Sequence, residues 1–247
     1  MKKILITMVT ALAVQGIYAQ DEVIFGDVMV ERNVQLTDYY NEKILNDPMP
    51  KLSTTDVSLR LNLRLYDGFG IWAKASILFD KSEDAPKSNI LGEFPAQKYY
   101  ILNERNYTAD SDVDFGISGG LFYQKYLNEK LRIVPYLGLL LRTFDTPSQY
   151  FDAKEIGSSN KYDVKHYWGN EYCYADMPFV TLEVQVSYRI HRFWDVTLGL
   201  SYRQSFQRLN FLSEIRDSYN YSNLIRRSEF TGNYMNTLGV SLGVSFR

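Results

Sequence analysis

Residues 235–247 read Met-Asn-Thr-Leu-Gly-Val-Ser-Leu-Gly-Val-Ser-Phe-Arg, and two kinds of side chain alternate along this stretch without a break. One face carries Leu238, Val240, Leu242, Val244 and Phe246, and the other carries Thr237, Gly239, Ser241, Gly243 and Ser245. A period of two residues indicates a β-strand, because successive side chains of a strand point to opposite faces. The stretch is therefore predicted to be a strand with one apolar face that ends in an aromatic residue.

Seven further segments show the same alternation. They are residues 23–30, 57–65, 71–79, 113–121, 131–141, 180–188 and 196–202. Most are close to the roughly ten residues that a tilted strand needs to cross a bilayer. The first is the weakest pattern, with Ile24, Val28 and Val30 set against Phe25, Asp27 and Met29. With the C-terminal stretch, the total is eight strands, an even number that allows a closed antiparallel barrel.

The connections between these strands differ in length in a regular way. Those after the second, fourth and sixth strands are short and span 66–69, 125–130 and 190–193. The other four are long and span 31–54, 81–111, 144–177 and 207–231. Short turns at one end and long loops at the other are typical of membrane barrels.

Aromatic residues gather near the predicted short-turn end: Tyr66, Tyr123, Tyr126, Tyr188, Phe193, Trp194 and Phe246. Rings of this kind favour the level of the lipid headgroups and form a girdle there. Ordinary strand chemistry is the alternative, since aromatic residues are common in any sheet.

The glycines indicate which face of the strands points into the barrel. Six fall on the polar face: Gly116, Gly120, Gly138, Gly199, Gly239 and Gly243. The interior of a small barrel is crowded and needs small residues, whereas a solvated exterior does not. The opposite face is almost uniformly Leu, Ile, Val or Phe, which suits lipid. The sequence therefore predicts an all-β fold, an eight-stranded antiparallel transmembrane β-barrel. The alternative is a secreted soluble barrel with the reverse orientation.

The N-terminus has the features of a secretory signal peptide. Lys2 and Lys3 precede the apolar run 4–14, and Ala19 supplies a small residue before a cleavage site at Gln20. Residues 1–19 are predicted to be removed, leaving one barrel domain over residues 20–247. No later run approaches the roughly 18 apolar residues of a membrane helix. The mean hydropathy of −0.27 is what alternating strands produce.

Combined with the export signal, the C-terminal strand resembles the closing strand of bacterial outer-membrane β-barrels. The stretch 135–140, Pro-Tyr-Leu-Gly-Leu-Leu, is similar to the P-Y-x-G-x-G stretch of small porin-superfamily barrels, the group that contains OmpA membrane domains, OmpX and OmpW. It departs at Leu140, where glycine is usual, and Arg247 follows the terminal aromatic residue. The resemblance implies outer-membrane lipid around the barrel, periplasmic short turns and extracellular long loops. It also implies that Phe246 is the assembly signal read by the barrel-assembly machinery.

Charged residues on the predicted inner face are expected to form an ion network: Arg60, Lys74, Asp114, Arg132, Arg142, Glu183 and Arg203. Isolated charges in a narrow lumen are costly, so they should pair. Glu183, near mid-strand, is the expected acceptor for Lys74, Arg60 or Arg203. An eight-stranded barrel leaves room only for side chains, so we expect a closed lumen. A narrow channel for small or amphipathic solutes, gated where the partner of Glu183 switches, is the alternative.

The long connections are rich in Tyr, Asn, Asp and Ser, a composition suited to interfaces. We expect them to carry a structural or surface-interaction role, with other envelope proteins or extracellular ligands as partners. The alternative is that they only pack on one another. A second alternative is a lipid A-modifying enzyme, which would use Ser159, His166 and Asp176 as its catalytic set.

Other classes of function find little support in the composition. The single cysteine, Cys173, cannot form an intramolecular disulfide. A net charge of −2 and a pI near 5.8 provide no basic patch for nucleic acid. Neither a zinc nor a calcium motif occurs, so no metal site and no cofactor are predicted.

Overall fold

The computed structural model describes residues 23–37, 53–81, 90–107, 114–146, 148–169 and 174–247. The predicted signal peptide, Val113 at the start of one predicted strand, and Cys173 lie outside these residues. Within the described ranges all regular structure is β-strand. No helix among them is long and apolar enough to cross a membrane.

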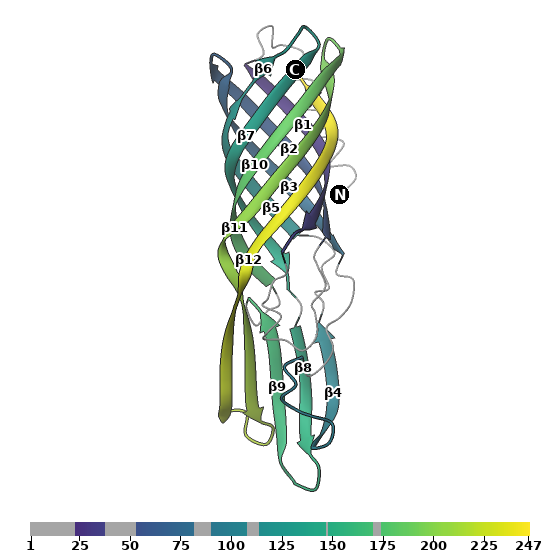
Figure 1. The fold of residues 1–247 in the computed structure, drawn as a ribbon, viewed down its shortest axis with the longest axis vertical. Helices are drawn as coiled ribbons and strands as arrows, with labels where there is room; N and C mark the ends of the chain where they lie inside the picture. The colour runs from purple at the N-terminus through teal and green to yellow at the C-terminus, as the bar shows by residue number, and fades with distance from the viewer. Residues whose placement is uncertain (1–22, 38–52, 82–89, 108–113, 147, 170–173) are drawn as a thin grey trace.

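Eight strands close into an antiparallel barrel (Figure 1). They are β1 (Ile24–Gln35), β2 (Ser53–Tyr66), β3 (Phe69–Lys81), β5 (Asp114–Tyr123), β7 (Leu131–Asp145), β10 (Tyr174–His191), β11 (Trp194–Asp217) and β12 (Leu224–Phe246). Neighbours in this order are paired, and β12 pairs with β1 to complete the ring. The short strand β6 (Lys125–Tyr126) adds to β7. The prediction of a closed, all-β, eight-stranded antiparallel barrel is confirmed.

The side chains of the strands point in the directions that the glycines predict, with the polar face inside the barrel and the apolar face outside. In β12, Leu238, Val240 and Leu242 point outward, while Ser241 and Ser245 are buried. A Cβ added to Gly239 would collide with Asn33, Glu31 and Ser201 inside the barrel. A larger residue at this position would force these lumen side chains to move.

Exposed aliphatic and aromatic side chains surround the whole barrel. Members of this apolar belt include Ile24, Val30, Leu61, Ile71, Ile117, Leu121, Leu137, Leu139, Leu182, Val184, Leu198, Leu200, Val240 and Leu242. Exposed apolar side chains on all eight strands match the lipid-facing band of a membrane barrel.

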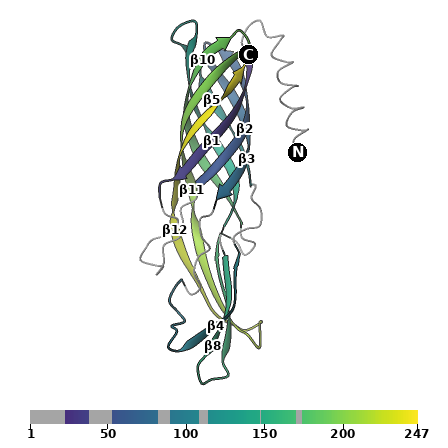
Figure 2. The same ribbon diagram turned by 90° about the vertical axis from the view of Figure 1, so that its right-hand side faces the viewer.

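The short turns lie at the end of the barrel that also holds the end of β12 (Figures 1 and 2). Between β2 and β3, Asp67 and Gly68 both have positive φ, of 41° and 83°. Such a two-residue turn matches the twist of the flanking strands. Exposed rings at this end include Tyr66, Phe69, Tyr126, Tyr188 and Phe193. They occupy the level expected of an interfacial girdle.

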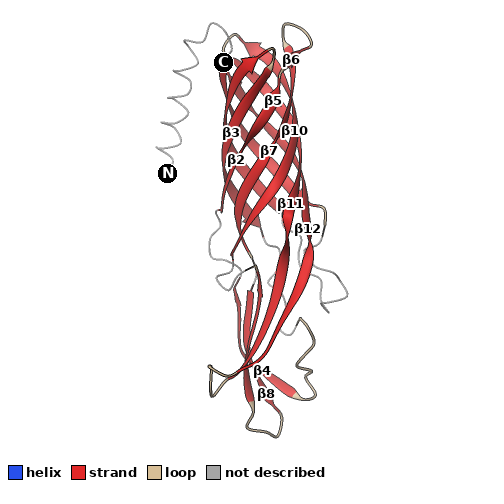
Figure 3. Cartoon of the chain, turned by 90° about the vertical axis from the view of Figure 1, so that its left-hand side faces the viewer, coloured by secondary structure: helices blue, strands red, loops and turns tan. Residues whose placement is uncertain are grey.

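The opposite end of the barrel differs from the prediction. Much of the long connections, predicted as loops, is built as strands: β4 (Tyr99–Tyr107), β8 (Ser148–Glu155) and β9 (Lys161–Trp168). β11 and β12 also run well beyond the barrel before they turn. These segments pair in the order β12-β11-β9-β8-β4 and form an open sheet, here called the distal sheet. Figure 3 shows it extending away from the barrel.

The distal sheet has one apolar and one polar face. Phe151, Ala153, Val164 and Ile215 pack together with Phe94 on the apolar face. Lys161, Asp163 and Lys165 alternate with these residues along β9 and lie on the other face. Register shifts between Gln204 and Asn210 mark where β11 passes from the barrel into the sheet. Such bulges bend a strand and increase its twist. The sheet is therefore a packed element joined to the barrel by two continuous strands.

Candidate functional site in the lumen and the distal sheet

Six buried charged side chains meet in the middle of the lumen, and we call them the central ion cluster. They are Glu31, Asp56, Arg60, Lys74, Glu183 and Arg203. Arg60 Nη2 lies 2.5 Å from Glu183 Oε2, and Lys74 Nζ lies 3.8 Å from the same oxygen. Arg203 instead contacts Glu31 at 2.5 Å and Asp56 at 3.0 Å. Three cations therefore face three carboxylates, so the cluster is balanced in charge.

Two members of this cluster, Glu31 and Asp56, lie in or at the edge of a segment predicted as a connection. Glu31 bonds Lys74 and Ser201 as well as Arg203. The inward alternation in fact continues from Met29 through Glu31 to Asn33. Arg32 interrupts the alternation in the sequence, because this charged residue faces outward at a position where the pattern predicts an apolar residue. Its guanidinium donates to Thr55 and Ser53 on β2.

Arg132 lies in a second group near the short-turn end. Its guanidinium lies 3.3 Å from Asp195 and donates to Ser245. Arg247 reaches the same Asp195 carboxylate at 2.7 Å. The residue after Phe246 is thus turned into the lumen, and Phe246 pairs with Gly26 and Trp194 on the neighbouring strands.

Asp114 and Arg142 are buried at the other end of the lumen. In the strand register Asp114 stands opposite Leu78, and Arg142 stands opposite Met177. The predicted network residues thus lie inside the barrel at three levels. Arg60, Lys74, Glu183 and Arg203 share the central cluster, whereas Arg132 lies nearer the short turns and Asp114 and Arg142 lie nearer the distal sheet.

Side chains fill the space around the central ion cluster. The guanidinium of Arg60 lies 4.0 Å from the ring centroid of Tyr136 and 5.1 Å from that of Trp72. The cavity beside Lys74 and Glu183 measures about 10 Å³, which holds at most about one water molecule. This part of the lumen offers no room for a solute.

An apolar cluster of buried side chains lies where the barrel meets the distal sheet. Its members come from four barrel strands, from the end of β9 and from the segment before β4: Ile90, Leu140, Trp168, Met177, Phe179, Leu209, Phe211 and Met235. Ions and polar solutes pass such a cluster only at a high desolvation cost. We call it the apolar plug.

His166 is buried on the apolar face of the distal sheet. It lies between the rings of Phe151 and Phe211, with centroids 5.4 Å and 5.7 Å away. Neither ring nitrogen has a hydrogen-bond partner among the described residues. Burial lowers the pKa of His166 to about 4, so the imidazole is neutral at pH 7.

The residues proposed to act with His166 lie elsewhere. Ser159 is in the exposed turn after β8, and Asp176 accepts a hydrogen bond from Thr143. The structure does not bring Ser159, His166 and Asp176 together. The other histidine, His191, ends β10 at the short-turn end. Among the residues that the structure covers, no three His, Cys, Asp or Glu side chains are grouped so that they could hold a metal ion.

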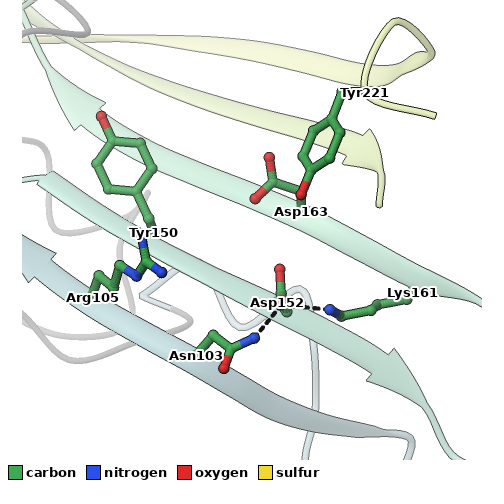
Figure 4. A pocket seen from close by; sticks show the side chains of 7 residues that line it. All are labelled: Asn103, Arg105, Tyr150, Asp152, Lys161, Asp163 and Tyr221. Atoms are coloured by element: carbon green, nitrogen blue, oxygen red, sulfur yellow. Dashed lines mark hydrogen bonds and ion pairs between the residues drawn. The ribbon is translucent and has the colours of Figure 1, made fainter. Parts of the chain in front are cut away.

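A pocket of about 500 Å³ opens on the polar face of the distal sheet. Its lining, drawn in Figure 4, is Asn103, Arg105, Tyr150, Asp152, Lys161, Asp163 and Tyr221. These residues come from β4, β8, β9 and the turn between β11 and β12. Alternate positions on each strand supply the lining because they share one face of the sheet.

The two carboxylates of this pocket differ in their surroundings. Asp152 Oδ2 accepts hydrogen bonds from Asn103 and Lys161, both at 2.7 Å. This bond to Asp152 raises the pKa of Lys161, which therefore stays charged. Asp163 has no hydrogen bond or ion pair within the described part of the chain, and partial burial raises its pKa. The pocket thus combines one engaged carboxylate with one that is available to a ligand.

Comparisons with known proteins give likenesses in shape only. No family model matches the chain, and no curated protein matches it in sequence. Neisserial surface protein A has 12% identity and a TM-score of 0.41, with 91% of this chain and 97% of that chain covered. A major outer membrane protein from Thermus thermophilus has 13% identity and a TM-score of 0.40, with 90% and 98% covered. The attachment invasion locus protein Ail of Yersinia pestis has 7% identity and a TM-score of 0.35, with 90% and 98% covered. Likenesses this low carry no argument about function.

Proposed function

We propose that this protein is a bacterial outer-membrane barrel with a closed lumen, which presents the distal sheet outside the cell as a binding surface. The proposal depends on where the molecule is filled and where it is accessible. The lumen is filled by the central ion cluster and the apolar plug, while the pocket lies on the projecting sheet. A binding role would use the accessible pocket on the distal sheet, whereas transport would require an open path through the barrel.

The same proposal includes the membrane location, export and assembly of the barrel. The apolar belt contacts outer-membrane lipid, and residues 1–19 serve for export. The C-terminal strand, with Phe246 at its end, is the signal for the barrel-assembly machinery. A relationship to the group of OmpA membrane domains, OmpX and OmpW is part of the proposal, and its support is the similarity of residues 135–140, in β7, to the P-Y-x-G-x-G stretch of that group. Partners are ligands or envelope proteins that meet the distal sheet, and the role is binding rather than chemistry.

Purified protein in planar lipid bilayers is expected to give no steady, resolvable current. The apolar plug and the packed ion cluster fill the lumen at two levels among the described residues, and filled levels of this kind oppose the passage of ions. A known porin, inserted in the same bilayers, serves as the positive control. A stable unitary conductance in every insertion would contradict the closed lumen and favour the alternative of a narrow channel.

Labelling in intact cells tests where the distal sheet lies. In a Cys173→Ser background, Ser159→Cys places a thiol in the exposed turn after β8, and Glu129→Cys places one in a short turn. A membrane-impermeant maleimide is expected to label Ser159→Cys on intact cells, and Glu129→Cys only after permeabilisation. The reverse pattern would place the distal sheet in the periplasm and end the proposal of a surface role.

A further inference from the structure

The pocket on the distal sheet lies on strands that are packed against an apolar core. Phe151, Ala153 and Val164 pack into the apolar core directly behind the strands that carry its lining. Asp152 stands opposite Asp163 in the register of β8 and β9, and Arg105 stands opposite Tyr150 in that of β4 and β8. Lining residues on paired strands are held at fixed spacings, so the site needs little ordering when a ligand binds.

The charges of the pocket restrict its ligand. Two cations, Arg105 and Lys161, share the space with two carboxylates, Asp152 and Asp163. The formal charges of these four lining side chains cancel, which favours a neutral ligand over a strongly charged one. The lining residues that the structure describes include no aliphatic side chain, which disfavours an apolar ligand or the hydrophobic anchor of a peptide.

Two groups in the pocket are open to new hydrogen bonds. Asp163 provides a carboxylate acceptor, and Arg105 provides a guanidinium donor. Neither side chain takes part in a hydrogen bond or ion pair within the described residues. A ligand that fits must therefore offer donors and acceptors close to each other, and a hydroxyl group is both at once.

Two tyrosine rings complete the site. In Figure 4, Tyr150 and Tyr221 lie at separate positions around the group of charged side chains. Tyr221 is 60% exposed, in the turn between β11 and β12. Rings of this kind give flat apolar contact area with little loss of side-chain entropy. The faces of pyranose rings, which carry C–H groups, match such surfaces. The pocket of about 500 Å³ also falls within the range of about 300–1,000 Å³ typical of small-molecule sites.

We infer that this pocket binds a neutral saccharide, whose hydroxyl groups bond Asp163 and Arg105 while a sugar ring packs on Tyr221. The inference rests on the proposed function, because the site must face the outside of the cell to meet glycans there. It specifies the ligand class of that surface. A charged glycan and a peptide are the competing ligands, and the test separates them.

Refolded full-length protein is applied to an array of neutral, N-acetylated and sialylated oligosaccharides and of basic and acidic peptides. Binding to neutral oligosaccharides is expected, with little change between low and physiological salt. The best-bound free oligosaccharide is then titrated against variants. Asp163→Asn is expected to weaken its affinity about tenfold or more, because a charge-assisted hydrogen bond is lost. Tyr221→Ala should weaken it to a similar extent, and Tyr221→Phe should retain it.

The matched control is Tyr219→Ala, which removes an exposed ring from the same turn but outside the pocket. It should leave the affinity unchanged. Because Tyr221 lies in a turn, its variants do not depend on the sheet tolerating a change at Asp163. Binding only to sialylated glycans or to peptides would overturn the inference, as would equal affinity for Tyr221→Ala and Tyr219→Ala. An array without signal, with Ser159→Cys still labelled on intact cells, would refute the saccharide and leave the proposed function standing.

Discussion

The Glu31→Met variant is expected to lose about 3–5 kcal/mol of folding free energy, since removing one partner of a buried ion pair leaves uncompensated charge. Glu31 contacts Arg203 at 2.5 Å and Lys74 at 3.2 Å, and it accepts a hydrogen bond from Ser201. Without it, three cations would face only two carboxylates among side chains that are almost fully buried. Urea-dependent refolding into phospholipid vesicles, followed by heat-modifiable migration on gels, measures the loss.

The double variant Glu31→Met, Lys74→Met is the matched control. It restores the charge balance, because Arg60 and Arg203 then face Glu183 and Asp56. We expect it to be more stable than Glu31→Met alone, as buried ion pairs can often be replaced by apolar residues of similar volume. A single variant as stable as the wild type, or a double variant in which the losses simply add, would show that charge balance does not hold the lumen together.

The barrel itself could be predicted because its signal is local. Each strand repeats a two-residue pattern along its own sequence, and one buried face specifies the register. The orientation could be predicted from the size of the residues on each face. Gly199 and Gly239 face an interior where a Cβ would meet Ser241 or Asn33. Neither inference needs knowledge of which strands are neighbours.

The distal sheet could not be predicted in the same way. β4 pairs with β8, and β9 pairs with the outer part of β11, so each pairing joins segments far apart in the sequence. Along β9, residues such as Lys161, Asp163 and Lys165 have the composition of a loop, although they alternate with Tyr162 and Val164. The pairing of distant segments decides the structure here, and the alternation within one segment does not report which other segment it pairs with.

The candidate site was missed for the same reason. Its lining residues lie between Asn103 and Tyr221 on four separate segments, and no motif spacing connects them. In the lumen, by contrast, Glu183 could be identified as an acceptor because alternation alone places it inside. Glu31 was missed because the outward Arg32 broke the apolar face beside it.

A charge on the outside of the barrel tests the orientation on which every proposal depends. Leu198, on β11, is 56% exposed and pairs in the register with Val186 and Leu242, near the middle of the apolar belt. Leu198→Arg is expected to destabilise the folded protein in vesicles by about 2–4 kcal/mol, because the guanidinium would face hydrocarbon. The control variant is Leu65→Arg, because Leu65 lies beside Tyr66 and the short turn after β2. A charge at this interfacial level should cost about 0–1 kcal/mol.

Refolding in urea, with both variants in vesicles of one lipid composition, measures the difference in folding free energy between the two variants. A soluble barrel with the reverse orientation predicts the opposite result. Leu198 would then be a surface residue in water, and arginine would be tolerated there as well as at position 65. Equal stabilities for the two variants would therefore exclude hydrocarbon around the belt. A loss that grows from Leu65→Arg to Leu198→Arg requires a bilayer, since only a bilayer makes the cost of a charge depend on its depth.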